Sequence, residues 1–198
     1  MRVAIIPARG GSRRIPKKNI RSFHGYPMLA YAITVAKQAG LFQRIVVSTD
    51  DNEIGKIAYD FGAEFRKRDA YHSQDGIGTQ EVAKHVLSQL DGPAFDMACV
   101  IYPCVPLLVA EDLRVGYRAC TGGAYSMAVG AEPLRDAGAF YWGYTWAFAQ
   151  GLPLIGPATA MVPLPEERVC DINTEDDWQE ADRRYTALLA RQKEVVNA

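Results

Sequence analysis

Positively charged side chains gather near the N-terminus of the sequence, within the stretch RGGSRRIPKKN. They are Arg9, Arg13, Arg14, Lys17 and Lys18. Two adjacent glycines, Gly10 and Gly11, lie among them, and successive N–H groups of such a turn can point toward one anion. Arginine grips phosphate oxygens with a forked guanidinium, whereas lysine contributes a point charge. These residue types at this spacing indicate a site for several phosphate groups, such as a triphosphate.

The glycine pair matches neither the dinucleotide-binding motif G-x-G-x-x-G nor the phosphate-binding motif G-x-x-x-x-G-K-[ST]. Two other interpretations of the loop therefore stay open: an exposed loop without a ligand, and a patch that contacts nucleic acid. The nucleic-acid interpretation is disfavoured, because the 22 Lys and Arg residues are balanced by 23 Asp and Glu residues and no further basic run extends the loop. The position directly after an apolar strand favours a ligand over an empty surface loop.

The elements around the loop alternate between strands and helices. Val3–Ile6 is a short, β-branched apolar run, typical of a parallel strand covered on both faces. A helix is predicted from Pro27 to Gly40, where apolar residues recur at helical spacing. Further strands are predicted over Arg44–Thr49, Ala63–Phe65, Met97–Tyr102 and Tyr125–Val129, and further helices from Asp50 and Asp51 to Gly62, over Thr79–Leu90 and over Ala110–Ala119. This order predicts an α/β fold with a mostly parallel sheet and helices on both faces.

The alternation changes past Glu132. Ala139–Trp142 is a predicted strand, and Gly151–Pro165 is expected to form loops around a short extended piece. A C-terminal amphipathic helix is predicted to begin at Thr174, where Thr-Glu-Asp-Asp resembles a capping box. Its apolar stripe, expected to pack in the core, comprises Trp178, Ala181, Tyr185, Leu188 and Leu189. We expect residues 1–198 to form a single domain.

Cysteine usage and hydropathy restrict the class of protein. The cysteines Cys99, Cys104, Cys120 and Cys170 form no Cys-x-x-Cys pair, which indicates reduced thiols rather than a zinc site or disulfides. No apolar stretch approaches the length of a membrane span, and the N-terminal run is too short for a signal peptide. We expect a cytoplasmic protein with neither membrane nor nucleic acid as a partner. The three histidines are dispersed along the chain, and the sequence assigns them no chemistry.

A series of motifs runs through the chain in a fixed order. IIPARGGSRRIPKKNI is followed by FHGYPMLAYAI, LFQRIVVSTDDNEIGKIAYDFGAE, IYPCVPLL, DAGAFYWG and DINTEDDW. This series resembles the acylneuraminate (CMP-nonulosonate) cytidylyltransferases over nearly the whole chain, and its last two motifs are most similar to the pseudaminic acid branch of that family. The resemblance implies a Rossmann-like, nucleotidyltransferase type A-like fold. It also implies an enzyme that joins CTP to an acidic nine-carbon keto-sugar and releases pyrophosphate with Mg²⁺.

The resemblance assigns the basic loop to the nucleotide. The residues that match the family's triphosphate loop are Ala8, Arg9, Gly10, Gly11, Ser12, Arg13, Lys18 and Asn19, with Arg13 standing where lysine is common. Arg68 and Asp75 match the segment that reaches the base and ribose, although Asp69 replaces a usual proline; an exposed loop before a helix remains the alternative. Tyr102 matches a Tyr-Pro pair beneath the substrates, with core packing as its alternative.

Asp171 and Asn173 match two carboxylates that hold Mg²⁺ in relatives. The implied catalytic residues are then Arg9, Arg13, Lys18 and Asp171. Because the amide of Asn173 carries no negative charge, we expect a weaker metal site than in those relatives.

The chain departs most from the family between Ala131 and Asp136. Relatives have a longer excursion there, which forms dimer contacts and reaches the sugar, so residues 131–165 are expected to form an abbreviated acceptor and dimerisation region. A homodimer is consequently in doubt, and exposed aromatic rings in GAFYWGYTW are expected to offer a replacement interface. Two other functions stay open: a nucleotide-binding relative with little turnover, and transfer to a different sugar acceptor.

Overall fold

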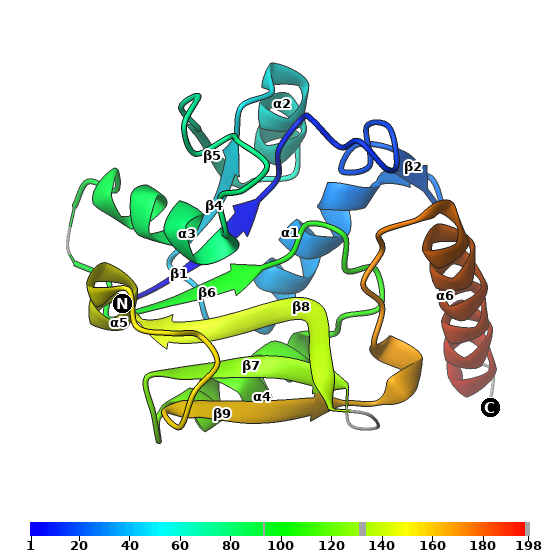
Figure 1. Cartoon of the computed structure of the whole chain (residues 1–198). Coiled ribbons are helices and arrows are strands. Elements are labelled where there is room, and N and C mark those ends of the chain that lie inside the picture. The colour runs from blue at the N-terminus through cyan, green and yellow to red at the C-terminus, as the bar shows by residue number, and fades with distance from the viewer. Residues whose placement is uncertain (93, 131–133, 197–198) are drawn as a thin grey trace.

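The computed structural model describes residues 1–92, 94–130 and 134–196 (Figure 1). The strands are β1 (Arg2–Pro7), β2 (Ser22–Phe23), β3 (Tyr26–Pro27), β4 (Arg44–Thr49), β5 (Glu64–Lys67), β6 (Met97–Ile101), β7 (Tyr125–Gly130), β8 (Arg135–Tyr144) and β9 (Thr159–Leu164). The helices are α1 (Met28–Ala39), α2 (Asn52–Asp60), α3 (Thr79–Ser88), α4 (Ala110–Cys120), α5 (Thr145–Gln150) and α6 (Glu175–Val196), and Glu166–Arg168 forms a 3₁₀ turn.

Within these ranges, seven strands form one twisted sheet in the order β5-β4-β1-β6-β8-β7-β9. Neighbouring strands are parallel except at β8, which is antiparallel to both β6 and β7. Side chains of β1 alternate between the two faces: Val3 and Ile5 belong to one apolar cluster and Ala4 and Ile6 to the other. The predicted α/β fold with a mostly parallel sheet is confirmed.

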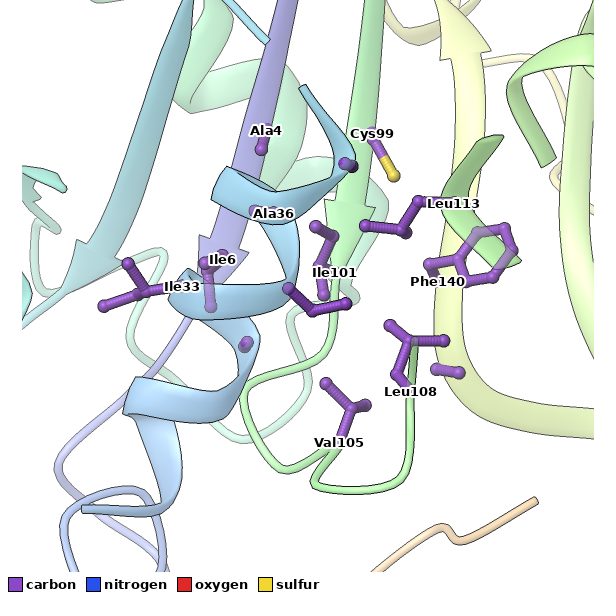
Figure 2. Packing of buried hydrophobic residues seen from close by; sticks show 14 of the residues in the cluster. Ala4, Ile6, Ile33, Ala36, Cys99, Ile101, Val105, Leu108, Leu113 and Phe140 are labelled. Carbon is purple, nitrogen blue, oxygen red and sulfur yellow. The ribbon is translucent and has the colours of Figure 1, made fainter. Parts of the chain in front are cut away.

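Helices cover both faces of the sheet. Helices α1, α2 and α4 pack on one face, and α3 and α5 on the other. Figure 2 shows the first layer, where Ile33 and Ala36 of α1 lie against Ile6 of β1 and Ile101 of β6. Because this layer is closely packed, the strand ends that it supports are held in a fixed frame.

Helix α6 stands beside the sheet rather than on it (Figure 1). A third apolar cluster joins Trp178 and Ala181 of α6 to Ile15 of the basic loop and Phe23 of β2. The predicted capping box is present, because the Asp177 N–H donates to Oγ1 of Thr174 at 3.2 Å and the Thr174 N–H donates to Asp177 Oδ2 at 2.7 Å. The outer part of the predicted stripe is only half-buried: Tyr185, Leu188 and Leu189 line a groove against α1.

Most predicted elements are present with ends shifted by a few residues, but the region after β7 differs. Strand β8 begins at Arg135 rather than Ala139, and α5 was not predicted. The expectation of exposed rings in GAFYWGYTW is wrong for Phe140, Tyr141 and Trp142, which are at most 1% exposed. These rings are buried because β8 is an interior strand that is covered on both faces. The cysteines are free thiols, as expected.

The connection between β7 and β8 is short. Gly130 of β7 pairs directly with Arg135 of β8, so only four residues connect the two strands. Residues 131–133, on which part of the expected departure falls, lie outside the described residues. No helix in the described ranges is both long enough and apolar enough to cross a membrane.

Gly116 of α4 lets the helix approach β8 closely. A Cβ atom there would lie 2.4 Å from Phe140 Cε2 and 2.9 Å from Trp142 Cδ1. Gly116→Ala should therefore lower the free energy of unfolding by about 1–3 kcal/mol through overpacking, although alanine favours a helix by about 1 kcal/mol over glycine. Urea denaturation measures the change. Gly122→Ala, where the nearest atom would be 4.0 Å away, is the matched control; equal stability of both variants would contradict the tight packing.

Candidate functional site

A cavity of about 550 Å³ opens at the carboxyl ends of β1, β5 and β6. Most of the residues singled out from the sequence line it: Arg9, Ser12, Arg13, Lys18, Asn19, Arg68, Asp75, Tyr102, Asp171 and Asn173. Arg14 and Gln74 also line it and were not assigned from the sequence. This edge of the sheet is where α/β folds bind ligands, since the loops that leave the strands converge there.

Backbone hydrogen bonds fix where each loop leaves the sheet. The Ala8 N–H donates to the Ser48 carbonyl at 2.9 Å, and the Arg68 N–H donates to the Thr49 carbonyl at 2.7 Å. The Tyr102 N–H donates to the Ala139 carbonyl at 2.9 Å. Side chains that are far apart in the sequence are thereby brought to one rim.

Two arginines of the basic loop share one carboxylate. Arg9 forms an ion pair with Asp75, and Arg13 Nη2 lies 2.7 Å from Asp75 Oδ2. The hydrogen bond from Arg9 lowers the pKa of Asp75, so this group stays charged throughout the neutral range. In this arrangement Asp75 acts as a counter-ion inside the cavity. An incoming polyanion would have to compete with it for both arginines.

Arg68 is a buried cation, with only 6% of its surface exposed. Its Nη2 donates to the Ser48 carbonyl at 2.8 Å and its Nε to Ser48 Oγ at 3.2 Å. Among the described residues, no carboxylate oxygen lies within 4.0 Å of the guanidinium. Burial consequently lowers its pKa. Because an unpaired buried charge is costly, Arg68 favours an anionic ligand in this cavity.

The rest of the basic loop is tied to the segment before α6. Lys18 Nζ donates to the Ile172 carbonyl at 2.5 Å, and Arg14 Nη2 donates to Asn173 Oδ1 at 2.7 Å. The buried Asn19 side chain donates to the Arg9 carbonyl at 2.8 Å. These contacts hold the loop in one position over the strand ends.

The two glycines of the loop have different surroundings. The Gly10 N–H donates to Asp50 Oδ1 at 2.8 Å, and a Cβ at Gly10 would lie 2.7 Å from Asp51 Oδ2. Glycine is thus needed there for a close approach to the start of α2. Gly11 is exposed, and a Cβ there would meet no atom within 4 Å. Neither glycine lines the cavity, and the side chain of Ala8 is buried in the core.

Two carboxylates lie together around Gly138, and one of them, Asp171, lines the cavity. Asp136 Oδ1 accepts the Gly138 N–H at 2.8 Å, and a Cβ at Gly138 would lie 2.8 Å from Asp171 Cγ. The pKa of Asp136 is raised, first by desolvation and then by the charge of Asp171. The pKa of the half-buried Tyr102 is raised as well, by burial and by both carboxylates. The rim is therefore acidic where the basic loop ends.

Sequence reasoning did not assign Asp136, although it lies in the DAGAFYWG motif. It reaches this rim because β8 is antiparallel to its neighbours, so its first residues lie beside the last residues of β7, where Asp136 pairs with Val129. The available signal in the sequence was Gly138 two positions later, since glycine readily adopts a positive φ, which is 59° here. Asn173, which was assigned, uses its carbonyl oxygen to accept the Arg14 hydrogen bond.

Known proteins are similar to this chain in both sequence and structure. A sequence profile of the cytidylyltransferase family matches residues 3–141. A pseudaminic acid cytidylyltransferase of Campylobacter jejuni subsp. jejuni serotype O:23/36 is 31% identical over 221 residues, which cover 92% of this chain and 95% of the relative. That alignment is longer than the 198 residues of this chain, so the relative contains residues without a counterpart here.

Two further proteins extend the comparison. The N-acylneuraminate cytidylyltransferase A of Danio rerio is 28% identical over 217 residues, which cover 91% of this chain and 50% of that protein. A CMP:2-keto-3-deoxy-manno-octonic acid synthetase, solved in complex with CTP, superposes with a TM-score of 0.73 at 16% identity, covering 96% of this chain and 99% of that one. The structural match supports the fold.

Removing the internal counter-ion should strengthen polyanion binding. Asp75→Asn frees Arg9 and Arg13, so its affinity for tripolyphosphate should rise several-fold over that of the parent, as measured by calorimetry. Asp60→Asn removes the same charge from an exposed pair with Lys56 on α2 and serves as the control. Equal affinities of both variants would show that Asp75 does not compete with phosphate.

Proposed function

The chain belongs to the cytidylyltransferase family and is a nucleotidyltransferase, and from this premise we propose that its cavity binds CTP and a nonulosonic acid and joins them into a CMP-sugar with release of pyrophosphate. The observation that carries the proposal is that cations and carboxylates meet at one cavity. Arg9, Arg13 and Arg68 line the cavity together with Asp171, and Asp136 lies near Asp171 around Gly138. The arginines suit phosphate groups, and the two carboxylates suit a divalent cation.

The basic loop is the proposed triphosphate site. The anomeric hydroxyl of the sugar attacks the α-phosphorus in line, and negative charge grows on the departing pyrophosphate. Arg9, Arg13 and Lys18 are placed to stabilise that charge, because the loop is already fixed by Asn19 and the Ile172 carbonyl. Preorganised cations lower the barrier more than flexible ones, since they need not move during the reaction.

Nucleotide contacts beyond the phosphates are proposed for other residues that line the same cavity. Arg68 and Tyr102 line the cavity, and the family resemblance assigns both to the nucleotide. Asp75 would exchange its arginine partners for the base or ribose when the triphosphate arrives. Ser12 of the basic loop lines the same cavity and is also proposed to contact the nucleotide.

Mg²⁺ is the proposed cofactor, held at the acidic rim. Asp171 fits as a ligand, because Mg²⁺ commonly binds one or two carboxylates together with substrate phosphates. Asp136 is the better second carboxylate, since the Asn173 amide is engaged with Arg14 while Asp136 lies against the same glycine as Asp171. When bound, the ion would neutralise phosphate charge; the protein's own residues fix where the phosphates lie.

The acceptor is proposed to be a nine-carbon keto-sugar acid of the pseudaminic or sialic type. Only four residues connect Gly130 and Arg135, and the Campylobacter jejuni relative contains residues without a counterpart in this chain. Residues 131–165 would then form a reduced acceptor region, and a homodimer built through that region would be weakened. A relative with little turnover, or one using another sugar, is the alternative that this shortening favours.

One assay tests both the activity and the nucleotide. With Mg²⁺ and a panel of nonulosonic acids, pyrophosphate should be released with CTP and much more slowly with ATP, GTP or UTP, because a base pocket with unpaired polar groups rejects the wrong base. Calorimetry without the sugar gives the binding preference separately. Equal binding of all four nucleotides would reduce the site to a general phosphate site, and CTP binding without pyrophosphate release would support the relative with little turnover.

Three variants distinguish the two possible carboxylate pairs. Asp171→Asn and Asp136→Asn should each raise the Mg²⁺ concentration for half-maximal pyrophosphate release by about tenfold, as loss of a ligand does. Asn173→Asp should change it little, because the new carboxylate pairs with Arg14. The opposite pattern, with Asn173→Asp lowering the requirement and Asp136→Asn leaving it unchanged, would place the ion at positions 171 and 173.

A further inference from the structure

Two of the three histidines come together with an aspartate away from the acidic rim. Asp69 and His72 lie in the segment between β5 and α3, and His85 lies on α3. One potential ligand atom from each residue lies within 4.8 Å of the other two. None of the three lines the cavity described above. The cluster is therefore separate from the proposed catalytic site.

The contacts within the cluster are close. His72 Nδ1 lies 2.8 Å from Asp69 Oδ1, and His85 Nε2 lies 3.7 Å from Asp69 Oδ2. The two imidazole rings stack with centroids 3.7 Å apart and an angle of 17° between their planes. Both histidines are mostly covered, with side-chain exposures of 14% and 13%. The aspartate thus faces the ring nitrogens of both histidines.

His85 Nε2 is buried without a hydrogen-bond partner among the described residues. A buried polar atom in this state costs about 1–3 kcal/mol. A metal ion bound through this nitrogen would satisfy it, since neutral imidazole nitrogens are common metal ligands.

We propose that Asp69, His72 and His85 form a binding site for one transition-metal ion of the Zn²⁺ type. Imidazole nitrogens favour Zn²⁺, Cu²⁺ and Ni²⁺, whereas Mg²⁺ prefers oxygen ligands. Two imidazoles and one carboxylate complete three of the four positions of a zinc site. Because a metal ion lies near the plane of each imidazole that it binds, the stacked rings must tilt apart on binding.

The site would brace the wall of the nucleotide cavity. The segment that begins at Asp69 carries Asp75, and the helix that carries His85 also carries Thr79 and Val82, which line the cavity. A metal ion bound to Asp69, His72 and His85 would join this segment to α3 outside the lining of the cavity. Its role is structural, so the site does not depend on the proposed function.

Nuclear magnetic resonance of the imidazole nitrogens tests the site directly, because the chain has only three histidines. Addition of one equivalent of Zn²⁺ to the nucleotide-free protein should shift the signals of His72 and His85. His24, which faces Asp182 Oδ1 at 2.9 Å, is the internal control and should stay unchanged. Unchanged signals of His72 and His85, or equal shifts of all three histidines, would overturn the proposal.

Calorimetry with variants provides the second measurement. His85→Gln and His72→Gln should each weaken Zn²⁺ binding by about tenfold or more, whereas His24→Gln should leave it unchanged. Asp171→Asn tests whether the acidic rim takes up the ion instead, and an effect equal to that of His85→Gln would contradict the assignment. The cysteine thiols should compete little for Zn²⁺ near neutral pH. Three of them are buried, and burial raises the pKa of the partly exposed Cys170 to about 11.

Discussion

Uncompensated positive charge at the carboxyl ends of the strands is the interaction on which the rest of the site depends. Arg68 is buried among neutral partners, while Arg9 and Arg13 share the single carboxylate of Asp75. An anion close to these arginines would offset the cost of burying the charge of Arg68. In the ligand-free protein the anion is a side chain, and with CTP bound it would be a triphosphate. In the ligand-free and in the CTP-bound protein alike, an anion would therefore lie against these arginines.

Holding these cations in place requires more than the loop itself. The buried cluster that includes Ile15, Phe23 and Trp178 joins the loop to α6, and Arg21 reinforces it through Glu175 and the face of Trp178. The segment before α6 then receives hydrogen bonds from Lys18 and Arg14. Helix α6 thus holds the basic loop in place. Its apolar stripe packs against residues near this loop, which lie beside the sheet rather than on it.

The sequence was sufficient for features that depend on local patterns. The strand and helix around the basic loop follow from apolar periodicity, and the capping box at Thr174 follows from residue types three positions apart. Asp136 could not be assigned, because its place depends on the antiparallel direction of β8, which pairing with β6 and β7 decides. The burial of Phe140 and Trp142 was missed for the same reason. His72 and His85 meet only because a turn precedes α3, so their spacing in the sequence carried no signal.

The register of β7 and β8 has a consequence for how such an enzyme could diversify. Gly130 and Arg135 close the pair beside the acidic rim, only one residue from Asp136, while the sheet behind them is packed by the large rings of β8. Extra residues inserted between these two positions would lengthen this connection without altering the strand pairing or the core contacts of the described residues. Under the proposed function, the length of this connection could therefore change the choice of acceptor independently of the residues proposed to bind the nucleotide.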